Sequence, residues 1–406
     1  MINPKPPSGF LALLAAQFLS ALADNALLFV TIGFLKLEHA PAWHIPFLQI
    51  MFVIPFILFA PFVGPYADNH AKGRVLMLGN GIKLIGAILL LAGKISPLAD
   101  YGIVGLGAAI YAPAKYGILT ELVSYEGLIG ANAWLESSTI VAILLGVIIG
   151  GHLADWSIQG GLVTVGLIYS LAATVNLAIP SISPVHAGKK LNVTHFITNC
   201  YQSARTLTAI APARASLVGT SIFWGTGSAM RFLLIAWVPF AFGIQNNHTA
   251  ANLNGVIAIG IIFGAILAGR IIRLDNILKI LPFGLAIGPL LILMIPIHTL
   301  SIATSVLIML GFCGGTWVVP LNAILQQAGY NSIGSGYAVA VQSLFENLSM
   351  LIMVGLYALA VKLDIPITTI TVVFGLFIFL GIYHVGNMLR ACQKNELSEL
   401  DNSQKG

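Results

Sequence analysis

Charge-free apolar stretches recur along the whole chain at a spacing of roughly thirty residues, and this pattern limits the fold more than any single motif does. Two clear examples run from Phe47 to Pro65 and from Val256 to Gly269. Only 8% of the 406 residues are charged and 58% are hydrophobic, whereas about 25% of residues in an ordinary soluble domain are charged. Because a soluble fold cannot cover so much apolar surface, the sequence predicts an all-α integral membrane protein.

A membrane-spanning helix needs about 20 apolar residues, and division at polar and Gly/Pro clusters gives twelve such segments. The predicted spans are 10–37, 47–67, 75–93, 100–121, 128–153, 161–180, 216–243, 252–270, 280–297, 302–327, 337–361 and 366–389. The first exceeds the ~7–15 residues of a signal-peptide core, so we expect it to be retained. The expected organisation is an N-terminal six-helix bundle (1–180), a cytoplasmic linker (181–213), a C-terminal six-helix bundle (214–390) and a cytoplasmic tail (391–406).

Loop charges predict the orientation of these spans. Of the 19 Lys and Arg residues, three lie inside spans and three others, Lys36, Lys94 and Lys362, fall on one side, which leaves thirteen for the opposite side. Basic loops stay in the cytosol, so both termini are expected there. The net charge of +5 arises in these loops, and no nucleic-acid partner is expected. The three cysteines are far apart, so neither a disulfide nor a metal site is expected, and we expect no cofactor.

The two halves of the chain resemble each other, as in transporters built from repeated bundles. The segment Asn132-Ala-Trp-Leu-Glu136 corresponds to Gln342-Ser-Leu-Phe-Glu346 in the other half. Asp24 lies 14 residues into the first span of its half, and Arg231 lies 14 residues beyond Leu217, near the start of the first span of the other half. This depth is about 21 Å, a little beyond the middle of a ~30 Å core. Glycines four residues apart, as at Gly146/Gly150 and Gly260/Gly264, predict close helix packing.

Six ionisable residues fall inside predicted spans, where a charge costs about 2.5–3.5 kcal/mol and is expected to face the bundle interior or a wet cavity. They are Asp24, Lys83, Lys115, Glu136, Arg231 and Glu346. For Lys83 and Glu136 a structural salt bridge is at least as good an interpretation as a functional role. Asp24 and Arg231 are stronger functional candidates, because their spans normally face each other across the cavity of two-bundle transporters. Asn25 adds hydrogen-bonding capacity at the depth of Asp24.

A loop motif lies between the second and third spans, Gly64-Pro-Tyr-Ala-Asp68-Asn-His-Ala-Lys72-Gly73-Arg74. It resembles the loop signature of the major facilitator superfamily, with two extra residues between Asp68 and Gly73. This resemblance implies a fold of two six-helix bundles. We assign Asp68 and Arg74, together with Lys83 and Glu136, to gating or structural charge pairs. Asp68 is expected to meet the N-terminal end of the eleventh span near Gly334. The similar stretch ending in Asp155 lies on the outer side, and we interpret Asp155 as a loop carboxylate.

At a finer level the chain resembles the bacterial lysophospholipid transporters of this superfamily nearly end to end. The stretches that carry the likeness are Ala16-Gln-Phe-Leu-Ser-Ala-Leu-Ala-Asp24-Asn25-Ala-Leu-Leu-Phe29, Tyr111-Ala-Pro-Ala-Lys115-Tyr-Gly-Ile-Leu119, Phe223-Trp-Gly225 with Arg231-Phe-Leu-Leu, and Gln342-Ser-Leu-Phe-Glu346-Asn347. The resemblance implies that this protein is a flippase, which moves lysophosphatidylethanolamine and lysophosphatidylglycerol from the outer to the inner leaflet of the inner membrane. An acyltransferase that uses acyl carrier protein would then complete the remodelling. In that reading Asp24, Asn25, Lys115, Arg231 and Glu346 line the headgroup route of a monomeric protein.

Two other functions use parts of the same pattern. A proton-coupled exporter of drugs or small metabolites would employ Asp24 or Glu346 as its titrating group. A membrane acyltransferase would need a His followed five residues later by Asp, and none of the nine His residues has such a partner. The chain stops about 17 residues past its last predicted span, which leaves no room for a fused enzyme. We therefore expect a transporter and not an enzyme.

Overall fold

The computed structural model describes residues 8–94, 96–122, 128–180, 193–272, 274–333 and 335–403. Within these ranges every regular element is a helix, which confirms the all-α prediction. The chain divides into two compact units. Unit 1 comprises Met1–Thr194 and Gln245–Gly255, and unit 2 comprises His195–Ile244 and Val256–Gly406. One helix, α10 (Asn247–Ile271), therefore belongs to unit 1 at its start and to unit 2 along the rest of its length.

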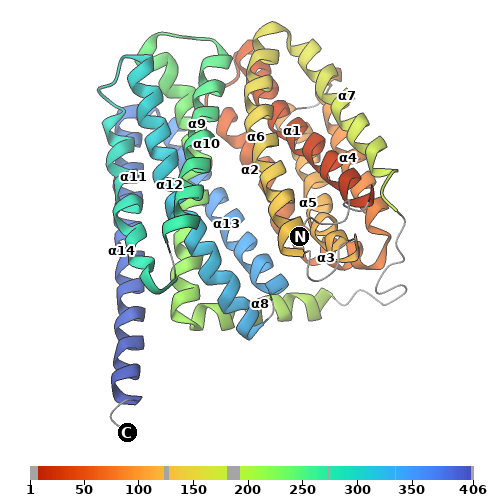
Figure 1. Ribbon diagram of the computed structural model, residues 1–406. Helices are drawn as coiled ribbons and strands as arrows, with labels where there is room; N and C mark the ends of the chain where they lie inside the picture. Colours follow the sequence, from red (N-terminus) through yellow and green to blue (C-terminus); the bar gives the residue numbers. More distant parts are fainter. Residues whose placement is uncertain are drawn as a thin grey trace. The chain divides into compact units, whose positions relative to one another are not determined.

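The helices of unit 1 run side by side (Figure 1). They are α1 (Ser8–Leu37), α2 (His44–Leu58), α3 (Ala60–Asn69), α4 (Lys72–Ala92), α5 (Pro97–Leu122), α6 (Leu128–Trp156) and α7 (Ile158–Asn176). α1 packs on α6 and α7, while α4 packs on α5 and α7. Local signals set several helix ends. The Ser157 hydroxyl caps α7 by accepting the Gly160 N–H at 3.0 Å, and α4 ends at Gly93, whose positive φ of 61° suits glycine.

The second predicted span is broken in the structure. α2 has only 15 residues and ends at Leu58, and α3 begins at Ala60 with Pro61 in its first turn. Pro61 has no N–H to donate to the carbonyl four residues earlier, so the helix cannot continue through it without losing a bond. The sequence predicted one continuous span over 47–67, because the residues on both sides of the break are apolar.

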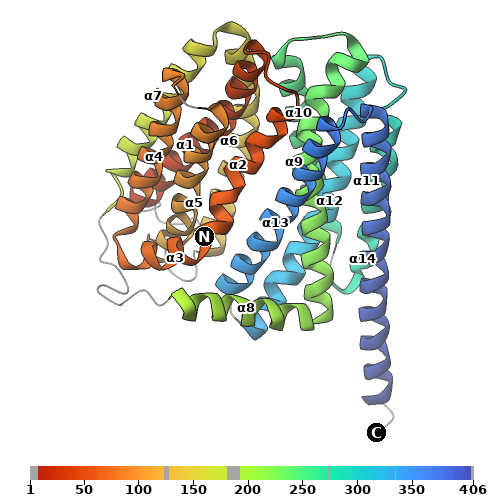
Figure 2. The ribbon, with the colours of Figure 1, turned by 180° about the vertical axis from the view of Figure 1, so that it is seen from behind.

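Unit 2 contains α8 (Val193–Ala209) from its third residue onward, α9 (Ala211–Phe242), most of α10, α11 (Leu281–Leu293), α12 (Leu300–Ser332), α13 (Ser335–Lys362) and α14 (Ile367–Ser403). A 3-10 segment, η2 (Leu274–Ile280), precedes α11. α9 packs against α12, α13 and α14, and α11 packs against α14 (Figure 2). Beyond the other helices of the unit, α14 continues for several turns.

The polar connection expected at 181–213 contains the helix α8. It crosses the ends of its neighbours in unit 2 (Figures 1 and 2). Leu207 is fully buried in a cluster that includes Leu217 and Leu325 from α9 and α12. Only one face of α8 is buried. The segment therefore lacks the continuous apolar run of a span, and its apolar residues recur about every 3.6 positions.

Eleven of the described helices are long and apolar enough to cross a membrane, and α2 is a shorter apolar helix. The predicted glycine packing is confirmed in both units. An ideal Cβ added at Gly150 on α6 would meet the backbone of Ala26 on α1, and one added at Gly264 on α10 would meet the Phe312 carbonyl on α12. These helices therefore approach each other at backbone distance.

Candidate functional site

A buried ion pair joins α1 to α4 in unit 1. The Lys83 Nζ lies 2.7 Å from Asp24 Oδ2, and the two side chains are 2% and 17% exposed. A lysine this deeply buried remains charged only where a partner compensates for its lost hydration. The structure therefore brings together two of the charges expected inside spans, and both belong to the same half of the chain.

Further polar groups surround this pair. The Tyr169 hydroxyl on α7 donates to Asp24 Oδ1 at 2.7 Å. Lys83 also donates to the Ser20 hydroxyl at 2.9 Å, and Ser20 in turn donates to Asn80 Oδ1 at 2.7 Å. Both carboxylate oxygens and two of the three ammonium hydrogens thus have a partner.

Aromatic rings complete the surroundings of the ammonium group. Lys83 Nζ lies 5.1 Å from the centroid of the Tyr111 ring and 5.9 Å from that of Tyr169. Both distances are within the range of a cation–π attraction. Gly107 on α5 makes room for the lysine stem, because an ideal Cβ there would stand 2.7 Å from Lys83 Cγ. The sequence thus places a small residue where the long side chain must pass.

Asn25 and Lys115 take other positions in unit 1. The Asn25 amide donates to the Ala21 carbonyl of its own helix at 2.9 Å, and the residue is half-buried. Lys115 is 8% exposed on α5. Arg74 is exposed at the start of α4. The side chains of Asp68 and Glu136, and residue Gly334, lie outside the described part of the chain, so the expected charge pairs at Asp68, Arg74 and Glu136 stay predictions.

A second polar group lies in unit 2, between α12 and α13. The Gln342 amide donates to Glu346 Oε1 and to Asn322 Oδ1, each at 2.7 Å. Glu346 is half-buried, and so is Arg231 on α9. Gln342 therefore links the Glu346 carboxylate, on its own helix α13, to the Asn322 amide on α12. The Thr220 hydroxyl also contacts this carboxylate, which with these two partners retains lone pairs for a cationic ligand.

Several of these partners were not predicted from the sequence as site residues. Ser20 lies four residues before Asp24, and Asn80 lies three before Lys83, so each shares a helix face with its charged neighbour. That spacing could have identified both residues. Tyr169 reaches Asp24 from a helix 145 residues away in sequence, and no local pattern marks it.

The prediction that Asp155 is a loop carboxylate is wrong. This residue lies in the last turn of α6, where it accepts the backbone N–H groups of Asn247 and His248 at 2.9 and 2.7 Å. The carboxylate thus caps the N-terminus of α10 within unit 1. Lys36 donates to Asn247 Oδ1 at 2.8 Å beside it. Among the described residues, no three His, Cys, Asp or Glu side chains are grouped as ligands for a metal ion.

Long apolar helices around a buried ion pair, with a second set of polar groups in the other unit, define a multi-span membrane transporter. The family model described as Major Facilitator Superfamily matches residues 13–354. The lysophospholipid transporter LplT of Citrobacter koseri is 46% identical over 367 residues, which are 90% of this chain and 92% of that protein. The protein of the same name from Escherichia coli O1:K1 is 46% identical over 374 residues, 92% and 94% of the two chains.

Solved structures show the same fold at low sequence identity. A POT family transporter in complex with 5-aminolevulinic acid gives a TM-score of 0.73 at 12% identity, over 93% of this chain and 95% of that one. A bacterial homolog of the human lysosomal transporter Spinster, inward-facing and unoccupied, gives 0.68 at 14% identity, over 96% and 99%. The chain belongs to the Major Facilitator Superfamily and, within it, to the family of these curated LplT proteins.

Proposed function

We propose that this protein is a lysophospholipid flippase of the bacterial inner membrane. The observation that carries the proposal is the 46% identity, over 92% of the chain, to a curated lysophospholipid transporter. In the proposed topology both termini are cytoplasmic, and residues 1–180 and 214–390 are the two bundles joined by the linker 181–213, with 391–406 as a tail. A monomer would move lysophosphatidylethanolamine and lysophosphatidylglycerol from the outer to the inner leaflet. The protein itself would not be an enzyme, and an acyltransferase would restore the second acyl chain.

The buried ion pair supports this proposal through the chemistry of the substrate headgroup. Lysophosphatidylethanolamine carries a primary ammonium, the same chemical group that Lys83 presents to Asp24 at 2.7 Å. Its phosphate is an anion of the kind that Lys83, Lys115 or Arg231 can bind by charge-assisted hydrogen bonds. A headgroup with both signs can therefore exchange partners with the ion pair, and neither buried charge is left alone during the exchange.

The group around Glu346 supports a further contact on the proposed route of the headgroup. In this proposal Glu346 or Asp24 meets the ammonium, and Asn25 supplies an amide beside Asp24. Lysophosphatidylglycerol lacks the ammonium, and its glycerol hydroxyls would instead use the amides of Gln342 and Asn322. Loss of a carboxylate is therefore expected to impair transport of the ethanolamine lipid more than transport of the glycerol lipid.

A flux measurement in reconstituted vesicles tests the proposal. Purified protein in liposomes is given fluorescent lysophosphatidylethanolamine in the outer leaflet, and its loss from that leaflet is compared with protein-free vesicles, with and without an imposed proton gradient. We expect protein-dependent flux that Asp24→Asn abolishes. The matched control is Asp364→Asn, an exposed carboxylate in the α13–α14 connection, which should keep full flux.

Two results would count against this function. Folded wild-type protein that moves lysolipid no faster than empty vesicles contradicts lysophospholipid transport. Flux that vanishes whenever the proton gradient is absent contradicts downhill movement drawn by reacylation alone, and would favour a proton-coupled mechanism.

A further inference from the structure

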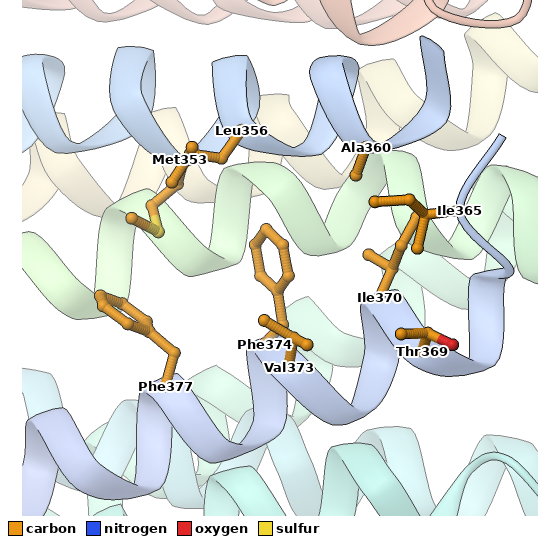
Figure 3. Close-up of a pocket in the computed structure, with 9 residues that line it drawn as sticks. All are labelled: Met353, Leu356, Ala360, Ile365, Thr369, Ile370, Val373, Phe374 and Phe377. Atoms are coloured by element: carbon orange, nitrogen blue, oxygen red, sulfur yellow. The ribbon is translucent and has the colours of Figure 1, made fainter. Parts of the chain in front are cut away.

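An apolar groove lies between α13 and α14 in unit 2, apart from the polar groups described above (Figure 3). Met353 and Leu356 line it from α13, and Thr369, Phe374 and Phe377 line it from α14. Eight of its nine lining residues are apolar, and Thr369 is the exception. Both walls belong to helices that are long and apolar enough to cross a membrane.

The groove runs along α13 and α14, away from the connection between them. Ile365 and Thr369 lie at the end near the α13–α14 connection, and Met353 and Phe377 lie at the other end (Figure 3). From Thr369 to Phe377 the helix rises by about 12 Å, which is most of one leaflet of a ~30 Å hydrocarbon core. The groove therefore has the length and direction of a lipid chain in a single leaflet.

The chemistry of its surroundings decides what fills the groove. At this depth water has no polar partners on the apolar walls, so hydrocarbon is the available occupant. The groove volume of about 280 Å³ is just below the ~300–1,000 Å³ of pockets that enclose a drug-sized ligand. It has room for part of one chain and not for a second chain or a headgroup.

The position of the groove along the membrane selects the leaflet. Loop charges predict that the α13–α14 connection faces the outer side. Lys362, the last residue of α13, is exposed at that same end. A cation there attracts the phosphate of a lipid whose chain lies in the groove. Because bilayer hydrocarbon is as apolar as the groove itself, the walls position the chain and do not extract it from the membrane.

We propose that this groove binds the single acyl chain of an outer-leaflet lysophospholipid before its headgroup enters the protein. This inference rests on the proposed function and assigns a place to the part of the substrate that the polar residues cannot hold. The chain stays in a hydrocarbon environment throughout, and the polar headgroup alone has to reach the interior.

Photo-crosslinking tests the proposal directly. Proteoliposomes receive lysophosphatidylethanolamine with a diazirine in the middle of its acyl chain, and the labelled peptides are mapped by mass spectrometry. We expect adducts on Met353, Phe374 or Phe377. Ala360→Trp, which fills the groove from α13, should lower this labelling about tenfold. Leu359→Trp, at a half-exposed neighbour outside the groove, is the matched control and should not lower it.

Competition and flux in the same vesicles separate the remaining outcomes. Excess unlabelled lysophosphatidylethanolamine should suppress the adducts, and diacyl phosphatidylethanolamine should not. Equal suppression by the diacyl lipid would overturn the proposal, because the groove would then hold an ordinary membrane lipid. Flux without adducts in the groove would also overturn it and would leave the transport function standing. Adducts without flux in folded protein would support the groove and contradict transport.

Discussion

Asp24 and Lys83 form an ion pair of 2.7 Å between α1 and α4, and each also hydrogen-bonds a side chain on another part of unit 1. Breaking a buried pair on one side costs more than removing both charges, because the remaining charge has no compensation. Because of this asymmetry, a double variant that lacks both charges can separate a structural role of the pair from a role in transport.

Lys83→Met should lower the free energy of unfolding by about 3–5 kcal/mol, since it leaves the Asp24 carboxylate buried without its cation. The double variant Asp24→Asn/Lys83→Met should regain most of that stability and still fail to transport lysolipid. Unfolding in detergent and flux in vesicles measure the two effects. Normal flux in the double variant would exclude the pair from the substrate route.

Tyr169→Phe should destabilise the protein by about 1.5–3 kcal/mol, because its hydroxyl donates to a charged carboxylate at 2.7 Å. Tyr111→Phe is the matched control. Tyr111 is also buried beside Lys83, but its hydroxyl has no hydrogen-bond partner in the described structure. A thermal-unfolding series should therefore show a lower midpoint for Tyr169→Phe alone. Equal shifts in both variants would mean that the hydroxyl bond to Asp24 contributes little.

Gln342→Ala should impair transport more than Asn322→Ala, because Gln342 donates to both Glu346 and Asn322. The two partners of Gln342 are coupled through it, so the effects of Asn322→Ala and Glu346→Gln should not add. A double-mutant cycle on flux rates measures the coupling. Strict additivity would show that Gln342 does not link these two side chains during transport.

Asp155→Ala should cost about 0.5–2 kcal/mol, the usual loss when a helix N-cap is removed. Hydrogen exchange should accelerate at the backbone amides of Asn247 and His248, which donate to this carboxylate. The first turn of α7, capped by Ser157, serves as the internal reference and should exchange at its wild-type rate. Unchanged exchange at Asn247 and His248 would contradict the capping role.

Apolar run length was enough to predict an all-α chain with most of its spans, because each run must match the thickness of hydrocarbon. Positions that depend on rotation about a helix axis were harder. Lys83 belongs to a span that usually packs on the outside of two-bundle transporters, yet its side chain points inward to Asp24 and is 2% exposed. Depth in the membrane follows from residue number, whereas the direction of a side chain depends on neighbours such as Gly107, whose lack of a side chain leaves space for the lysine.

The same limit applies to contacts between distant segments. Asp155 was predicted to be a loop residue, because its partners are backbone amides 92 and 93 positions away in the sequence. Every residue except proline has a backbone N–H, so the residue type does not show which amide will bind a carboxylate. α8 was missed for a different reason, since its burial is one-sided and its overall polarity resembles that of a connecting loop.

The start of α10 completes a unit whose other residues all precede it by at least fifty positions in the chain. A polypeptide ending at Thr194 would lack the amides that donate hydrogen bonds to Asp155, and Gly151 would lose the close contact with Ala251. The two halves synthesised separately should therefore behave as complementing fragments, with the first gaining its full resistance to proteolysis only when the second is present.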